Sequence, residues 1–226
     1  MICPVCNNKT FYNLKDGRKK CKKCGTRFSP KKIETEKKLI ECFCDDISAF
    51  ECSKRLSLSY VKAKTFYDKI RKEIALFLEK SFDQKRVLEY DEYIYLEKSK
   101  RGNKRNIFDA FSFLTFEYDD KIYNVLLEDL SRFKTQFLID GAEDAYYKEF
   151  SKNMMFNKIS KLQKKDNLIV KFWDFFESSI TKYKGIKREN FFYYLKECEF
   201  KFNYSKKEQI RIVIKLLKQH PTQTLR

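Results

Sequence analysis

The sequence predicts an α+β or mixed α/β fold in which a small metal-held module precedes a larger domain. Two Cys-x-x-Cys pairs lie within the first 25 residues, and apolar residues then recur at helical spacing up to about residue 82. A strand-like pattern follows, and helical patterns return toward the C-terminus. Strands first and helices later, around one sheet, are typical of this fold class. We expect four parts along the chain, at 1–30, 31–82, 83–204 and 205–226.

The two cysteine pairs predict a zinc ribbon. Cys3 and Cys6 form the first pair, and Cys21 and Cys24 form the second, which Gly25 follows. Two residues between thiolates allow a tight turn to aim both sulfur atoms at one tetrahedral ion, and glycine supplies the positive φ that such a turn needs. Because a module this small has almost no core, it depends on the metal to fold. We therefore expect these four cysteines to be ligands of a structural Zn²⁺.

The alternative for these cysteines is a pair of disulfides in a secreted module. Cys3 leaves no room for a signal peptide before it, so we expect reduced thiols. Four cysteine ligands close the coordination sphere, which makes the zinc a scaffold and not a catalyst. The remaining cysteines lie among apolar helical residues and are expected to be buried free thiols: Cys42, Cys44, Cys52 and Cys198.

The chain is strongly basic. Its 49 Lys and Arg residues outnumber its 32 Asp and Glu residues, which gives a formal net charge of +17. This surplus favours polyanionic partners, and nucleic acid ahead of a membrane, because the cations are dispersed and not gathered on one amphipathic helix. No apolar run approaches the length that spans a bilayer. We expect a cytoplasmic protein.

A pair of helices is predicted after the cysteine-rich segment. Residues 47–56 form a short helix with Ser48 as its cap, the polar stretch 57–59 ends it, and a longer basic helix begins at Tyr60. This layout is that of a helix-turn-helix, whose second helix enters the major groove of DNA, although an ordinary helical hairpin would look similar. The residues expected to face bases or phosphates are Tyr60, Lys62, Lys64 and Tyr67.

Strand-like runs follow, near residues 87–95, 107–116 and 122–127. The cationic stretch 98–105 is expected at the tip of the first hairpin, and 118–121 at the turn of the second. Four cations of the first tip are further expected DNA contacts: Lys100, Arg101, Lys104 and Arg105.

Further elements are expected in the second half of the chain. They are a helix near Leu130, a strand at 135–139 that ends at Asp140, a helix at 143–150 and a short strand at 155–159. The rest of the chain is expected to be helical. Its last helix, 206–218, is expected to pack against the protein through one apolar face, with an interface as the alternative.

Several segments resemble the small bacterial insertion-sequence transposases that carry an N-terminal zinc ribbon. Their C-terminal signature is similar to residues 167–173, 183–186, 190–192 and 194–203. The stretch from Glu89 to Glu92 resembles the first acidic motif of this family, and Ile139-Asp140 resembles the strand end that carries the second. The resemblance implies a ribonuclease-H-like catalytic domain and a bacterial, nucleoid-associated protein. Its implied partner is double-stranded DNA with terminal inverted repeats, which it would cleave and join as a homo-oligomer.

The implied chemistry needs carboxylates around divalent metal. Two Mg²⁺ ions about 4 Å apart activate the nucleophile and stabilise the leaving oxygen in phosphodiester transfer, and such hard cations prefer oxygen ligands. The resemblance implies Asp91 and Asp140 as ligands of Mg²⁺ or Mn²⁺, with help from Asn167 or Asp174. The alternative is that both aspartates are solvated acids and that Asn167 is only a helix cap.

The chain departs from the family pattern at two positions. Val170 stands where the family has Glu, and Glu177 stands where it has Lys. At helical spacing, Asn167, Val170, Asp174 and Glu177 share one stripe, opposite an apolar face. Two hypotheses follow: an active transposase, or a DNA-binding protein with a degenerate catalytic domain. A zinc-ribbon RNA-binding or transcription protein without transposase ancestry is a third, which leaves the acidic motifs unexplained.

Overall fold

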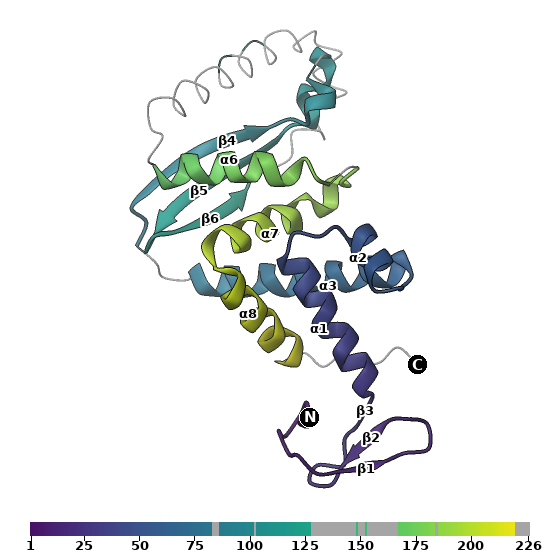
Figure 1. The fold of residues 1–226 in the computed structure, drawn as a ribbon. Helices are drawn as coiled ribbons and strands as arrows, with labels where there is room; N and C mark the ends of the chain where they lie inside the picture. Colours follow the sequence, from purple (N-terminus) through teal and green to yellow (C-terminus); the bar gives the residue numbers. More distant parts are fainter. Residues whose placement is uncertain are drawn as a thin grey trace. The chain divides into compact units, whose positions relative to one another are not determined.

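The computed structural model describes residues 1–82, 86–101, 103–127, 148, 152, 167–183 and 185–219 (Figure 1). The chain divides into two compact units. The N-terminal unit consists of Met1–Phe77 and Tyr204–Arg226, and the sheet unit consists of Leu78–Asn203. Small sheet, helices, a second antiparallel sheet and C-terminal helices together confirm the predicted mixed α and β content. The predicted division into four parts is finer than these two units and stays a prediction.

The N-terminal unit begins with a small antiparallel sheet. Its strands are β1 (Phe11–Asn13), β2 (Lys19–Cys21) and β3 (Arg27–Phe28), paired in that order. Phe11 packs edge-on against Phe28, with ring centroids 5.4 Å apart, beside the buried side chains of Cys3 and Cys21. This apolar cluster is small, so the ribbon has little to hold it together besides the cysteines themselves.

Four helices belong wholly or in part to the N-terminal unit: α1 (Pro30–Cys44), α2 (Ala49–Arg55), α3 (Tyr60–Phe82) and α8 (Lys206–Gln219). The predicted cap of α2 is confirmed, because Ser48 Oγ accepts a hydrogen bond of 3.1 Å from Glu51 N. Ser57, with φ of +52°, ends α2, and Ser59 Oγ accepts from Lys62 N at the start of α3. The prediction that α8 is a packing helix is confirmed, because α8 lies against α1.

In its described residues, the sheet unit has three antiparallel strands, β4 (Glu89–Tyr95), β5 (Phe111–Tyr118) and β6 (Lys121–Leu126), in the order β4-β5-β6. A two-residue turn joins β5 to β6, as predicted. Both turn residues have positive φ, +44° at Asp119 and +56° at Asp120. Turns of this kind match the twist of the strands that they join, and Asp tolerates the left-handed region better than most residues.

The connection between β4 and β5 differs from the prediction. Strands β4 and β5 do form a hairpin, but two 3-10 helices, Lys98–Lys100 and Lys104–Asp109, stand between them. The expected strand from residue 107 therefore begins only at Phe111. Ile107 and Phe108 pack instead with Leu96 in a separate apolar cluster. Their apolar side chains are explained by this packing. The pattern of apolar residues alone does not distinguish such a cluster from a strand of the sheet.

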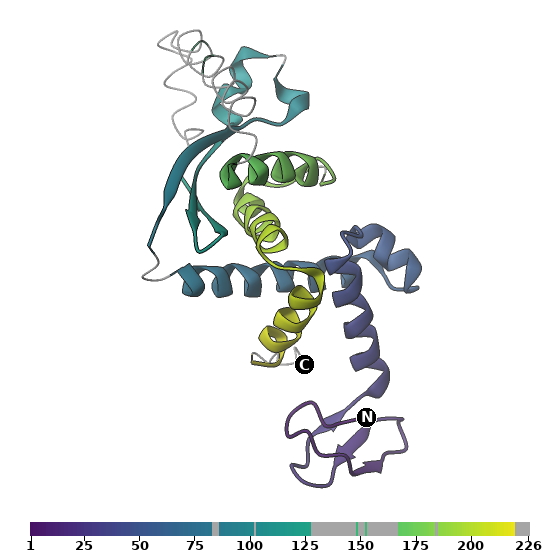
Figure 2. The same cartoon turned by 60° about the vertical axis from the view of Figure 1, so that its left-hand side comes forward.

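The core of the sheet unit lies between the sheet and two helices. Helix α6 (Leu168–Ile180) crosses one face of the sheet, and α7 (Phe191–Asn203) packs against α6 and β6 (Figures 1 and 2). The predicted buried face of α6 is confirmed, because its five residues are at most 2% exposed: Ile169, Phe172, Trp173, Phe176 and Ile180. The Asn203 side chain makes two hydrogen bonds with the backbone of Ile122, so α7 satisfies part of the outer edge of β6.

Charged groups are buried between α7, β6 and the end of α3. Lys196 Nζ lies 2.9 Å from Glu79 Oε1 and 3.2 Å from Glu199 Oε2. Glu199 Oε2 also accepts hydrogen bonds from the backbone N–H and the side-chain amide of Asn124. Lys196, Glu199 and Asn124 have no exposed surface, and burial raises the pKa of the Glu199 carboxyl although Lys196 and Asn124 favour its charged form.

Part of the predicted sheet domain lies outside the described residues. The expected helix near Leu130, the strand at 135–139, Asp140 and the strand at 155–159 all fall there, as does almost all of the helix at 143–150. Among the described helices, none is both long and apolar enough to cross a membrane.

Candidate metal centre and nucleic-acid interface

The four N-terminal cysteines form one cluster. Their Sγ atoms all lie within 4.8 Å of one another, with Cys3 and Cys24 3.6 Å apart and Cys6 and Cys21 3.5 Å apart. Four thiolates about 2.3 Å from a tetrahedral zinc ion stand roughly 3.8 Å from one another. The donor set and its spacing therefore fit Zn²⁺. In the described part of the chain, no other group of three or more His, Cys, Asp or Glu side chains comes together in this way.

Equivalent turns position the two cysteine pairs. The backbone N–H of Gly25 donates to Cys21 O at 3.0 Å, and that of Asn7 donates to Cys3 O at 3.1 Å. Both donors have positive φ, +73° at Gly25 and +56° at Asn7. The sequence predicted this role for Gly25, and Asn7 was not among the predicted residues. The signal was present, because Asn directly follows Cys6 as Gly directly follows Cys24, and Asn is the side chain that most readily replaces glycine there.

Local hydrogen bonds favour the thiolate form of the second pair. Burial opposes ionisation of Cys21, but backbone N–H groups and the Asn8 amide outweigh it and lower its pKa to about 6. The Thr26 hydroxyl and backbone N–H lower the pKa of Cys24. Thiolate is the form that binds zinc. All eight cysteines are free, so the disulfide alternative is wrong for this structure, and the four outside the cluster are buried, as predicted.

The α2–α3 pair exposes only part of the predicted DNA-contact set. Tyr60 is 48% exposed at the start of α3, and Lys62 is exposed beside it. Lys64 is also exposed, and its Nζ pairs with Asp68 at 2.8 Å. Tyr67 is different, because it is 2% exposed and its hydroxyl donates to Ile47 O inside the unit. Tyr67 is therefore a packing residue and not part of an exposed surface.

Two residues that the sequence analysis did not select lie next to Tyr60. Phe50 on α2 is 56% exposed, and its ring lies 6.3 Å from that of Tyr60. Lys54 Nζ lies 4.2 Å from the centroid of the Phe50 ring. An exposed aromatic pair with cations beside it can contact both bases and phosphates. We define the helix-pair face as Phe50, Lys54, Tyr60 and Lys62.

The cations of the β4–β5 connection are partly occupied within the protein. Lys100 Nζ lies 3.2 Å from Asp109, and Arg101 Nε donates to Leu96 O at 2.8 Å. The side chains of Lys104 and Arg105 lie outside the described set. The described contacts therefore give Lys100 and Arg101 a part in holding the connection together, and their DNA contacts stay a prediction.

Asp91 lies on the face of β4 that α6 covers. It alternates in phase with Glu89 and Tyr93 along the strand, and both neighbours reach α6. Asn167 Nδ2 donates to Glu89 Oε2 at 2.7 Å, and the Tyr93 hydroxyl donates to Glu177. Asp91 is half-buried between these two contacts, opposite Thr115 of β5. The predicted stripe of α6 therefore does run along this strand.

The two contacts also give the level of Asp91 along α6. From residue 89 to 93 a strand rises about 13 Å, and from 167 to 177 a helix rises about 15 Å. Strand β4 and helix α6 therefore run in the same direction, and the lengths that they cover between the two contacts are nearly equal. Asp91 then stands level with the part of α6 that holds Val170 and Asp174.

Near Asp91, the residues of this stripe provide few groups that could bind a metal ion. Val170 is 3% exposed and belongs to the apolar core. Asn167 Oδ1 accepts from Ile169 N at 2.8 Å and Val170 N at 3.3 Å, so Asn167 is a helix cap, as the alternative held. Asp174 is exposed, and Asp140 lies outside the described residues. The described residues do not by themselves make a magnesium site.

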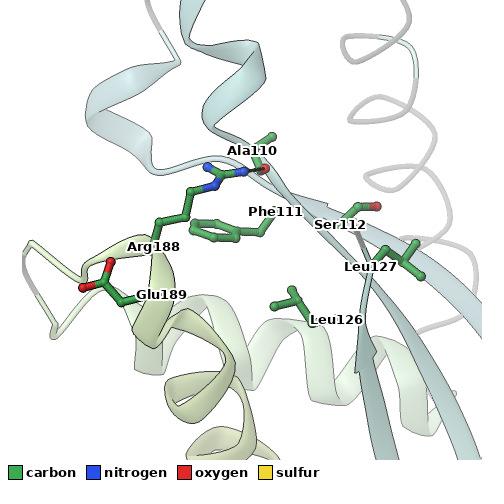
Figure 3. A pocket seen from close by; sticks show the side chains of 7 residues that line it. All are labelled: Ala110, Phe111, Ser112, Leu126, Leu127, Arg188 and Glu189. Atoms are coloured by element: carbon green, nitrogen blue, oxygen red, sulfur yellow. Dashed lines mark hydrogen bonds between the residues drawn. The ribbon is translucent and has the colours of Figure 1, made fainter. Parts of the chain in front are cut away.

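A hollow of about 300 Å³ opens near the start of β5 (Figure 3). Phe111, Leu126 and Leu127 line it, and Arg188 closes one side. The Arg188 guanidinium lies 4.5 Å from the centroid of the Phe111 ring and donates to Ala110 O at 3.0 Å. Among the described residues that line this hollow, none was predicted as a catalytic candidate.

Part of this chain is similar to a transposase-like protein. Over 53 residues it is 45% identical to an uncharacterized transposase-like protein of Haemophilus influenzae, which is 23% of this chain and 43% of that protein. The match thus spans less than half the length of the relative. No protein-family model matches the chain, and no solved structure matches it. The similarity is distant and partial, and it shows no catalytic residue.

Proposed function

We propose that this chain is the transposase of a small bacterial insertion sequence. It binds the terminal inverted repeats of its element as duplex DNA and catalyses metal-dependent strand cleavage and transfer. The placement of Asp91 on the α6-facing side of β4 carries this proposal, because it is a half-buried acid in a sheet and helix arrangement that suits a ribonuclease-H-like domain. The cysteine cluster and the partial similarity to a transposase-like protein support it.

Duplex binding is assigned to the helix-pair face at the N-terminal turn of α3. We expect Lys62→Gln to weaken binding of an inverted-repeat duplex and to reduce the slope of log affinity against log salt by about 0.9, the value for one lost phosphate contact. Fluorescence anisotropy over a salt series measures this. Lys72→Gln is the matched control, since Lys72 is exposed on the same helix nearly three turns away. Equal losses of duplex affinity in both variants would indicate that binding depends on the overall positive charge and not on a defined site.

Cleavage is assigned to Asp91 and Asp140, with Asn167 or Asp174 as the third group and Mg²⁺ or Mn²⁺ as the metal. We expect Asp91→Asn to abolish nicking of a duplex that carries the element end, because an amide cannot replace the carboxylate as a ligand of a hard cation. A gel assay with either metal measures the nicked product. Glu92→Gln is the control, since Glu92 is the next residue of β4 and lies on its other face. Nicking that survives in Asp91→Asn would end the assignment.

The second candidate is a transposase-derived protein that binds DNA without cleaving it. The burial of Val170, where the family has Glu, favours this candidate. It predicts duplex binding by the wild type with no nicking in Mg²⁺ or Mn²⁺. Val170→Glu separates the cases further, because a gain of nicking would mean that the rest of the site is intact. In both candidates the protein acts in the bacterial cytoplasm on nucleoid DNA, and pairing of two element ends requires a homo-oligomer.

A further inference from the structure

The ribbon sheet has two different faces. Side chains alternate along a strand, so Phe11, Cys21 and Phe28 point to the cysteine cluster while their neighbours point outward. The register of the strands places Tyr12 of β1 opposite Lys20 of β2, and Lys20 opposite Arg27 of β3. One row across all three strands thus carries an aromatic ring and two cations. We call this row the outer ribbon face.

Tyr12 is not used by the ribbon core. It is 57% exposed, while the neighbouring Phe11 fills the space beside Phe28. Lys22 Nζ lies 4.9 Å from the centroid of the Tyr12 ring. The ring thus lies on an open sheet surface with a third cation over its face. Packing within the ribbon does not account for an aromatic residue at this place.

The charge of the ribbon points to a polyanion. Its first 29 residues contain eight Lys and Arg residues and one acid, Asp16, a net charge of +7. Asp16 pairs with Arg18, so it does not neutralise the outer ribbon face. Zinc bound by four thiolates would lower the net charge by only two. The face therefore remains strongly positive when the metal site is filled.

We propose that the outer ribbon face binds single-stranded DNA, with a base stacked on Tyr12 and neighbouring phosphates on Lys20, Lys22 and Arg27. An exposed ring among cations is the arrangement that receives unpaired bases, whose flat faces are free to stack. A duplex offers phosphates to the cations but no free base face to the ring. This activity lies outside the helix-pair face and does not depend on the duplex binding proposed above.

The test uses the full-length, zinc-loaded chain with fluorescein-labelled oligo(dT) and, in parallel, an inverted-repeat duplex. Tyr12→Ile keeps a good strand former and removes the ring face, and we expect it to weaken oligo(dT) binding about tenfold. Tyr12→Phe keeps the ring face and should bind as the wild type does. Tyr90→Ala is the control, since Tyr90 is a 65% exposed aromatic on β4. Zinc content, measured for each variant, reports whether the ribbon is folded.

The outcomes separate the two proposals. A loss confined to oligo(dT) in Tyr12→Ile supports the outer ribbon face. If Tyr12→Ile loses affinity equally for single strand and duplex, or for neither, the proposal is overturned. This holds whether or not α3 binds duplex DNA. If Tyr12→Ile loses its zinc, a second measurement decides: the wild type is photocrosslinked to an oligonucleotide that contains 5-iododeoxyuridine. A crosslink at Tyr12 supports the proposal, and crosslinks only elsewhere overturn it. Failure of duplex binding with retained oligo(dT) binding would instead count against the helix-pair face.

Discussion

Cys21→Ser is expected to unfold the ribbon and release its zinc. Structural zinc contributes about 10–16 kcal/mol to small domains of this kind, far more than an apolar cluster built around Phe11 and Phe28 can supply. Serine keeps the volume of the side chain but not the thiolate ligand. We expect the zinc content to fall from about one per chain to well below it. Amide hydrogen exchange should lose its protection over residues 1–29 while β4–β6 keep theirs.

Cys42→Ser provides the matched control. Cys42 is a buried thiol on α1 that takes no part in the cysteine cluster, so its replacement should leave the zinc content unchanged. A chelator added to the wild type should reproduce the effect of Cys21→Ser. A wild-type zinc content far below one per chain would contradict the metal centre. So would a loss of protection that is equal in the ribbon and the sheet.

The same variant links the metal to nucleic-acid binding. Strand β1 carries Tyr12, and hydrogen bonds to β2 keep it opposite Lys20. Without zinc the ring and the cations no longer share a surface, so Cys21→Ser should lose oligo(dT) binding as well. Duplex binding through α3 should persist, because α2 and α3 have apolar contacts and caps of their own.

Local features of the sequence were the ones that could be read correctly. Spacing alone brought four cysteines together, because two ligands of each pair lie within one turn of the chain. The Ser48 cap and the Asp119-Asp120 turn follow from side-chain chemistry within a few residues. The turn of each cysteine pair, the cap and the Asp turn are decided by neighbours in the chain, whereas the meeting of the two cysteine pairs also depends on the pairing of β1 with β2.

Features that depend on tertiary contacts were harder to read. Tyr67 lies three residues after Lys64 on α3, and nothing local says that its hydroxyl reaches Ile47 O. The strand boundary near Ile107 was missed because apolar residues of a satellite cluster look like residues of a sheet. On α6, the period placed Val170 on the stripe that follows β4, but only the packed structure shows that it is closed into the core. Burial of this kind is set by the whole sheet unit.

The Lys196–Glu199 pair is a further feature that sequence did not reveal. Both residues lie in a segment that had been matched only to a family signature, and their spacing of three residues on a helix is also common on exposed faces. In the structure both are fully buried, and Lys196 Nζ lies 3.7 Å from the centroid of the Tyr123 ring. A charge pair without solvent has large consequences when one partner is removed.

Lys196→Met is expected to destabilise the sheet unit by about 3–5 kcal/mol at neutral pH, because the Glu199 carboxylate then stays buried without its cation. This is a large part of the about 5–15 kcal/mol that stabilises an ordinary protein. Methionine fills most of the lysine volume, so the loss is electrostatic and not a cavity effect. Urea denaturation followed by the fluorescence of Trp173, which lies in this core, measures it.

The pH dependence of the loss identifies its cause. Burial already raises the pKa of Glu199, and removal of Lys196 takes away an interaction that lowers it. An acid whose pKa is higher in the folded than in the unfolded protein binds its proton more tightly when folded, so stability falls as pH rises between the two values. The deficit of Lys196→Met should thus be smallest near the unfolded pKa of about 4.3 and reach its full size above the raised value.

Lys196→Met combined with Glu199→Gln completes the test. The double variant contains no buried charge at this place, and the Gln oxygen can still accept the hydrogen bonds of Asn124. Replacement of a buried ion pair by neutral groups of similar volume is often close to neutral, so the double variant should recover most of the lost stability and show no extra pH dependence. A double variant as unstable as Lys196→Met at every pH would mean that packing of the lysine stem, and not the unpaired carboxylate, causes the loss.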